Sequence, residues 1–158
     1  MPALSEFPPE VCASRQHPDL FYRRVPDLYA EPDGDPALDP KRKPVMKLEA
    51  ERLSVYRGAP GASMANALAV YVLDGLIAVP TGRVLVRFRE GIRAHTFEAA
   101  LRQLGYVIDE VIAYAPNAAW VRDAHGNVAR ALCNLDKLCQ LSGVENVEPQ
   151  FITARAKR

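Results

Sequence analysis

The chain has 158 residues, of which 49% are hydrophobic and 25% are charged, and its formal net charge is +1. This length and composition are typical of a globular protein with one domain and an appendage. A net charge so close to zero gives no general attraction for nucleic acid or for an anionic membrane.

The beginning of the chain indicates where the protein resides. Residues 1–9 lack the cationic start and apolar run of a secretory signal, and the apolar stretches at 67–73 and 76–80 are too short to cross a bilayer. The three cysteines are an odd number, which argues against a disulfide framework and favours free thiols. We therefore expect a cytoplasmic protein that needs no membrane, metal or cofactor.

Prolines dominate the first part of the chain. Nine of the 13 prolines precede residue 45, and each removes a backbone donor and biases its predecessor toward extended geometry. We predict that residues 1–45 form an extended arm with little regular structure. Its aromatic cluster contains Phe21, Tyr22 and Tyr29. These side chains either pack on the arm's own domain or form a partner-binding site, and the sequence leaves both readings open.

Residues 46–82 are interpreted as a lead-in segment that contains a β-hairpin. Two β-rich runs, 68–73 and 76–79, flank the pair Asp74-Gly75. An Asp-Gly pair at this position predicts a two-residue hairpin turn in which both residues have positive φ.

Residues 83–150 carry the clearest secondary-structure pattern. Residues 84–88 alternate as a strand, and Thr96 can cap a helix with one apolar stripe, after which Gly105 suits a left-handed C-terminal cap. The stripe consists of Phe97, Ala100, Leu101 and Leu104. Residues 106–113 then read as a second strand, because they are rich in β-branched side chains.

The pattern then repeats. A third strand at 118–122 leads to a second helix with Asn127 as its N-cap, and a last strand at 144–148 is ended by Pro149. This order predicts an α+β fold, the ferredoxin-like βαββαβ plan. Its four-stranded antiparallel sheet would carry two helices on one face and leave the other face open.

Three phrases in this part of the chain resemble a known family. They are residues 82–91 (GRVLVRFREG), 101–106 (LRQLGY) and 138–149 (LCQLSGVENVEP). They are similar to the first strand, the first helix and the closing helix and strand of the inhibitory propeptide domain of subtilisin-like serine proteases. The resemblance covers about residues 68–156.

The resemblance implies an inhibitor, and also a folding chaperone, of a subtilisin-like serine protease on a separate chain. In that family the open sheet face docks on the protease, and the segment after the last strand enters the active-site cleft. Here that segment is the tail 151–158, with Thr153 near the fourth subsite and Ala156 near the first. The candidate cleft-binding residues are Phe151, Ile152, Thr153, Ala154, Arg155 and Ala156.

An enzymatic function is not expected. His17, His95 and His125 lack the glycine-rich flanks of a subtilisin-type catalytic site, and no serine stands in a nucleophile-elbow context. The alternative that remains open is a ferredoxin-like regulatory module that binds a small ligand or RNA. For RNA, the third strand offers Trp120 without the basic and aromatic phrase of an RNA-recognition module. Trp120 is therefore interpreted as a core or partner-contact residue.

Overall fold

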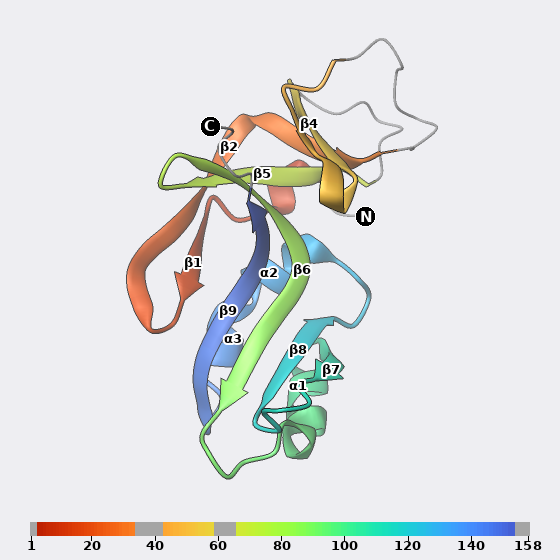
Figure 1. The fold of residues 1–158 in the computed structure, drawn as a ribbon. Coiled ribbons are helices and arrows are strands. Elements are labelled where there is room, and N and C mark those ends of the chain that lie inside the picture. The colour runs from red at the N-terminus through yellow and green to blue at the C-terminus, as the bar shows by residue number, and fades with distance from the viewer. Residues whose placement is uncertain (1–2, 34–42, 59–65, 154–158) are drawn as a thin grey trace.

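The computed structural model describes residues 3–33, 43–58 and 66–153, which are mostly β-structure (Figure 1). Their strands form one antiparallel, nine-stranded sheet that curls into half a barrel. The strands are β1 (Glu10–Ser14), β2 (His17–Pro32), β3 (Met46–Leu48), β4 (Leu53–Arg57), β5 (Leu68–Leu73), β6 (Leu76–Phe88), β7 (Tyr106–Val111), β8 (Ala118–Asp123) and β9 (Val144–Thr153).

The helices are short. They are α1 (Glu98–Gln103), α2 (Val128–Cys133) and α3 (Leu135–Cys139), together with the 3-10 turns η1 (Leu4–Glu6), η2 (Glu49–Glu51) and η3 (Ala94–Phe97). Across the described ranges, none of the helices has the length and apolar character that a membrane crossing requires.

The prediction of a four-stranded ferredoxin-like fold is wrong, because the sheet continues well beyond four strands. Its main path runs β3-β4-β2-β5-β6-β8-β7, while β1 pairs with β2 and β9 pairs with β6. The cause is β6, whose 13 residues pair with β5 at one end and with β8 at the other. The hairpin of the lead-in segment and the first strand of the expected domain are thus parts of the same strand.

The prediction that residues 1–45 have little regular structure is wrong for most of residues 10–32, whereas residues 1, 2 and 34–42 lie outside the described residues. Residues 10–14 and 17–32 form β1 and β2, and β2 pairs with both β4 and β5. The prolines of β2 are tolerated where the pairing is weak. Pro18 and Pro32 lie at the strand ends, and Pro26 lies within the register shift between Arg24 and Tyr29.

Several local predictions are confirmed. Asp74 and Gly75 have φ of 51° and 77°, and Leu73 pairs with Leu76 across the turn. Gly105 has a φ of 91° directly after the end of α1. Asn127 caps α2 by accepting a hydrogen bond from the Arg130 amide.

The N-cap predicted at Thr96 is wrong. Thr96 lies inside η3, and its hydroxyl donates to the Arg93 carbonyl at 2.7 Å. The α-helix begins only at Glu98, and no side chain caps it.

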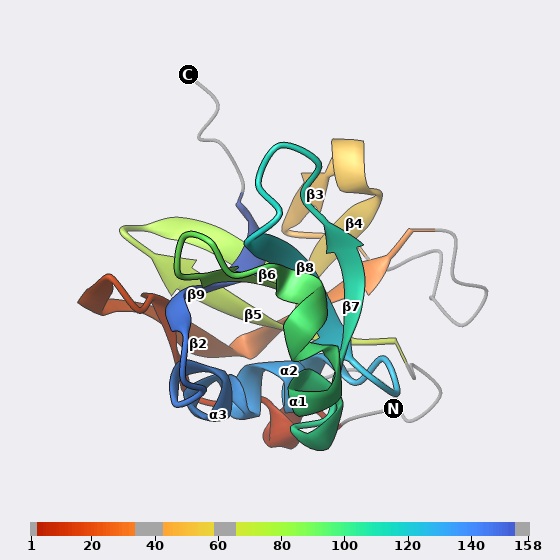
Figure 2. The same ribbon diagram turned by 90° about the horizontal axis from the view of Figure 1, so that it is seen from below.

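The two larger of three hydrophobic cores among the described residues lie on opposite sides of the sheet. Ala69, Tyr71 and Ala78 belong to the core under the helices, whereas Val70 and Val79 belong to the other core. This second core forms because the sheet curls, bringing β3 and β4 over one end of its helix-free side (Figures 1 and 2). Among the described residues, no layer covers the other end of that side, beside β8 and β7.

Candidate protein-binding face

The uncovered end of the sheet presents one side chain from every second residue of its strands. Val84, Val86 and Phe88 of β6 are buried toward the helices, so Arg83, Leu85 and Arg87 point to the opposite side. Leu85 pairs with Trp120 on β8 and with Glu148 on β9. We call this surface the helix-free face; its residues are Arg83, Leu85, Arg87, Asp109, Glu110, Trp120, Arg122, Glu145 and Glu148.

Trp120 lies at the centre of this face. Its ring is half-buried, with Leu85 opposite it on β6 and Glu110 opposite it on β7. The Arg83 guanidinium lies over the ring, with its carbon 4.8 Å from the ring centroid, which is a cation–π distance. The guanidinium group thereby restricts the positions that the ring can take.

The charged side chains around Trp120 neutralise one another. Arg83 contacts Asp109 at 3.0 Å and Glu110 at 3.1 Å, and Arg122 contacts Asp109 at 3.6 Å. At the other end of the face, Arg87 contacts Glu145 at 3.4 Å.

The helix-free face therefore carries no cationic field. Four carboxylates stand against three guanidinium groups, so its net charge is one negative. Nucleic-acid surfaces instead gather unpaired cationic groups for phosphates.

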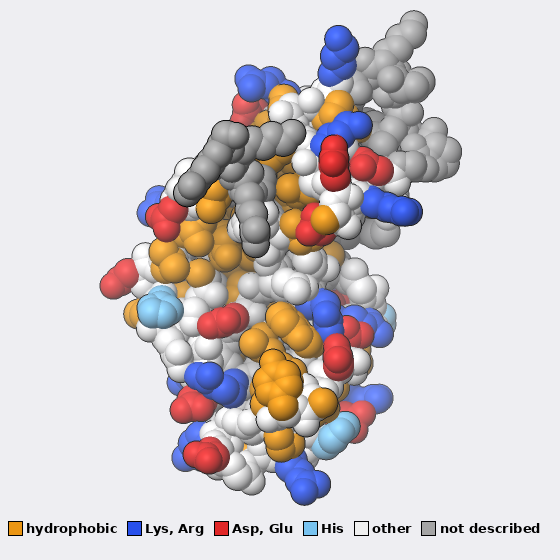
Figure 3. All heavy atoms as spheres, in the orientation of Figure 1, with side chains coloured by type: hydrophobic (Ala, Val, Ile, Leu, Met, Phe, Trp, Pro, Cys, Tyr) orange, Lys and Arg blue, Asp and Glu red, His pale blue; other side chains and the backbone are white. Residues whose placement is uncertain are grey.

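Figure 3 looks onto this side of the molecule in the orientation of Figure 1. Over its lower half, hydrophobic side chains gather between basic and acidic ones. A half-buried aromatic centre with a charged rim is the arrangement found in protein–protein interfaces.

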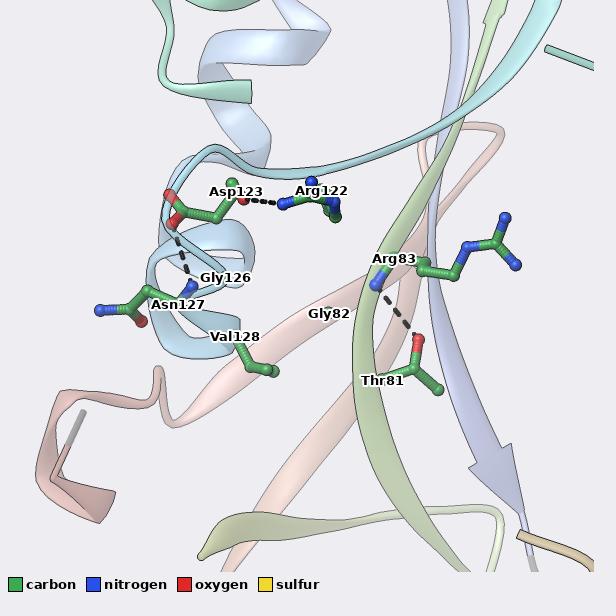
Figure 4. A pocket seen from close by; sticks show the side chains of 8 residues that line it. All are labelled: Thr81, Gly82, Arg83, Arg122, Asp123, Gly126, Asn127 and Val128. Atoms are coloured by element: carbon green, nitrogen blue, oxygen red, sulfur yellow. Dashed lines mark hydrogen bonds between the residues drawn. The ribbon is translucent and has the colours of Figure 1, made fainter. Parts of the chain in front are cut away.

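A small pocket lies beside the face, between β6 and the start of α2 (Figure 4). Its volume is about 90 Å³, well below the roughly 300–1,000 Å³ of typical ligand pockets. It is lined by Thr81, Gly82, Arg83, Arg122, Asp123, Gly126, Asn127 and Val128.

Polar side chains that line this pocket already have hydrogen-bond or ion-pair partners within the protein. The Asp123 carboxylate accepts from the amides of His125 and Asn127, and the Arg83 side chain points away from the pocket. The pocket therefore gives no support to a small-ligand function.

The structure places three of the six candidate cleft-binding residues inside the sheet. Phe151, Ile152 and Thr153 are the last residues of β9 and pair with Pro80, Val79 and Ala78 of β6. Ala154, Arg155 and Ala156 lie outside the described residues. The predicted tail thus does not begin at residue 151, because the strand continues to Thr153.

The aromatic residues of the predicted arm pack within the protein. Tyr29 is fully buried and stacks on Tyr56, with ring centroids 5.6 Å apart. Tyr22 is half-buried and stacks on Phe151, with centroids 3.8 Å apart and planes at 15°. Phe21 lies half-buried in β2, opposite Cys12. Tyr22 and Tyr29 therefore pack on the chain itself, which is one of the two possibilities that the sequence left open.

The histidines and cysteines do not assemble a reactive site in the described part of the chain. His17 begins β2, His95 lies in η3 and His125 follows β8 in a turn. Burial raises the pKa of the Cys133 and Cys139 thiols, which favours the unreactive protonated form. No group of three or more potential metal ligands occurs within residues 3–33, 43–58 and 66–153.

The charged members of this face were not identified from the sequence. The signal was present, because a strand whose even-numbered residues 84, 86 and 88 face the core must present residues 83, 85 and 87 on its other side. What it lacked was the pairing of β6 with β8 and of β8 with β7, which brings Trp120 and Asp109 to Arg83. Comparison with protein families, curated proteins and solved structures finds no match for this chain.

Proposed function

We propose that this chain is a non-catalytic protein that binds and inhibits a subtilisin-like serine protease carried on a separate chain. The helix-free face is the docking surface in this proposal, and Trp120 is its central contact. The partner class comes from the phrases at 82–91, 101–106 and 138–149 that resemble the propeptide of those proteases.

The single observation that carries a binding function is the environment of Trp120. A half-buried tryptophan beside Leu85, on a sheet face that no other described segment covers, offers apolar area that a partner can bury. The two arginines beside Trp120 already form ion pairs with Asp109 and Glu110, so a docking partner does not have to bury these groups as isolated charges.

The same charges favour a protein partner over RNA. Base-stacking platforms work together with free cationic groups that bind phosphates. On the helix-free face Arg83, Arg87 and Arg122 each contact a carboxylate. The RNA-binding alternative therefore finds no support in this geometry.

Three free thiols fit a reducing compartment such as the cytoplasm. The proposed partner is accordingly a protease of the same compartment. By binding only the folded protease, the chain also stabilises that folded state, which is how it would assist folding.

The test is titration of the purified chain into a purified subtilisin-like protease, with hydrolysis of a chromogenic peptide as the readout. We expect the wild-type chain to inhibit in a saturable manner. Trp120→Ala should weaken inhibition about 30-fold, the effect of losing an interface hot spot. Leu20→Ala is the control, because Leu20 is 37% exposed and lies in β2, a strand that contributes no residue to the helix-free face.

The two possible failures have different meanings. Absence of inhibition and of binding by the wild-type chain would show that the proposed function is wrong. Equal inhibition by wild type and Trp120→Ala would instead show that the helix-free face is not the docking surface.

A further inference from the structure

The last strand of the sheet consists of two parts that pair with β6 in different registers. Residues 144–149 pair with 84–88, and residues 151–153 pair with 78–80. The register shifts between Pro80 and Val84, where three residues of β6 lie opposite Gln150 alone. Such a bulge interrupts the ladder of backbone hydrogen bonds between the two parts.

Two prolines weaken the backbone pairing further at this junction. Pro80 lies opposite Phe151, and Pro149 lies opposite Val84. Neither proline has an N–H group, so a ladder donor is missing on each side of the bulge. A side-chain hydrogen bond of 2.8 Å, from the Thr81 hydroxyl to Gln150, bridges the gap.

The end of β9 is instead held by side chains from the first half of the chain. The Phe151 ring stacks on Tyr22 of β2 at 3.8 Å and meets Tyr71 of β5 edge-on at 5.4 Å. Ile152 packs on the second core, beside Val79. By contrast, residues 144–149 are held by Arg15, which follows β1. The Arg15 amide donates a hydrogen bond to the Val147 carbonyl, and the Arg15 guanidinium donates one to the Val144 carbonyl.

From these contacts we infer that Phe151–Thr153 is a clasp that opens separately from the rest of β9. In the closed state Tyr22 and Tyr71 hold Phe151 in the sheet. When the clasp opens, β9 ends at the bulge, and three residues become an extended segment with free backbone donors and acceptors.

This inference gives the proposed function a point of regulation, and in that respect it rests on the proposed function. A protease cleft binds extended peptide through backbone hydrogen bonds, which Phe151–Thr153 makes with β6 while the clasp is closed. The segment therefore either completes the sheet or becomes available to the partner. The Tyr22–Phe151 contact sets the population of the open state, and with it the apparent affinity.

Hydrogen exchange of the full chain tests the clasp without any partner. Tyr22→Ala should raise the exchange rates of the amides of Phe151, Ile152 and Thr153 about tenfold, because it removes an aromatic pair from the closed state only. The amides of residues 145–148 should keep their wild-type rates. Tyr22→Phe retains the ring and should exchange as the wild-type chain does.

Two results of this experiment would overturn the clasp. Equal acceleration of residues 145–148 and 151–153 would mean that β9 opens as one strand. Unchanged exchange at 151–153 in a folded Tyr22→Ala protein would mean that Tyr22 does not hold the segment.

The link to the partner is tested with the same variant in the protease assay. Tyr22→Ala should inhibit about tenfold more tightly than wild type, because less free energy is needed to open the clasp. Inhibition equal to or weaker than wild type would overturn this link. If wild type does not inhibit at all, the proposed function fails, and the exchange rates alone still decide whether the clasp exists.

Discussion

Arg83 lies over the ring of Trp120, with the guanidinium carbon 4.8 Å from the ring centroid, while its nitrogens contact Asp109 and Glu110. One arginine on β6 thus joins an aromatic residue of β8 to two carboxylates of β7. Since a guanidinium is planar and has several donors, it can stack and form ion pairs at once. This relationship orients the centre of the proposed docking surface.

Replacement of Arg83 by Met should separate binding from stability. The ion pairs of Arg83 are partly solvated, so we expect the free energy of unfolding to fall by less than about 1 kcal/mol in urea denaturation. Affinity for the proposed protease partner should fall about tenfold, because the Trp120 ring loses its contact with the guanidinium group. The control is Arg23→Met, which removes the Arg23–Glu10 ion pair away from the helix-free face.

Phe7 links the beginning of the chain to the main core. Its side chain is only 2% exposed and belongs to the core under the helices. Phe7→Ala should therefore lower the free energy of unfolding by about 3–5 kcal/mol, as expected for removal of a large core side chain. Leu20→Ala, at an exposed position of β2, should change it by less than about 0.5 kcal/mol. Similar small effects of both changes would contradict the inclusion of the N-terminal residues in the core.

Gly105 tests the backbone geometry after α1. An added Cβ would meet no atom within 4 Å, so the penalty comes only from the φ of 91°. Gly105→Val should lower the free energy of unfolding by about 1–2 kcal/mol, and Gly105→Asn should cost less because asparagine tolerates left-handed geometry. The measurement is urea denaturation of both variants beside wild type. A urea denaturation curve for Gly105→Val identical to that of wild type would contradict the cap.

Two buried tyrosines should make the fold sensitive to alkali. Burial raises the pKa of Tyr71 and of Tyr106 above the usual value of 10.0. In the unfolded chain these phenols lose their protons near pH 10, so the folded state binds protons more strongly above that pH. The stability contributed by these shifts is complete below pH 10 and is lost as pH rises toward the folded-state pKa.

Urea denaturation across the alkaline range checks this expectation. Tyr71→Phe and Tyr106→Phe should each reduce the steepness of the stability loss above pH 10, because phenylalanine does not titrate. The two changes remove hydrogen bonds to the carbonyls of Pro8 and Ala131, so both variants start from a lower stability at neutral pH. An alkaline slope equal to that of wild type would contradict the assignment.

Local features of the fold follow from short stretches of sequence. The Asp74-Gly75 turn, the glycine after α1 and the Asn127 cap each depend on a few neighbouring residues, whose conformational preferences act over one turn of chain. The same holds for the alternation of Val84, Val86 and Phe88. These features needed no knowledge of the remaining chain.

The prolines before residue 45 led to the wrong prediction of little regular structure. Proline disfavours a strand only at positions where a backbone N–H must donate to the neighbouring strand. In β2, Pro18, Pro26 and Pro32 stand at the ends or in the register shift, which the sequence of β2 alone does not reveal. The pairing of β2 with β4 and β5 decides which amides of β2 must donate backbone hydrogen bonds.

The contacts on the helix-free face also depend on which strands pair. Local sequence is enough to predict the strand periods, the tight turns and the residue types on each side of a strand. The contacts of Arg83 with Trp120 and of Tyr22 with Phe151 appear only once the strands are paired, since strand pairing depends on residues far apart in the chain. A strand's own residues set which side chains share a face, whereas its neighbours set what those side chains touch.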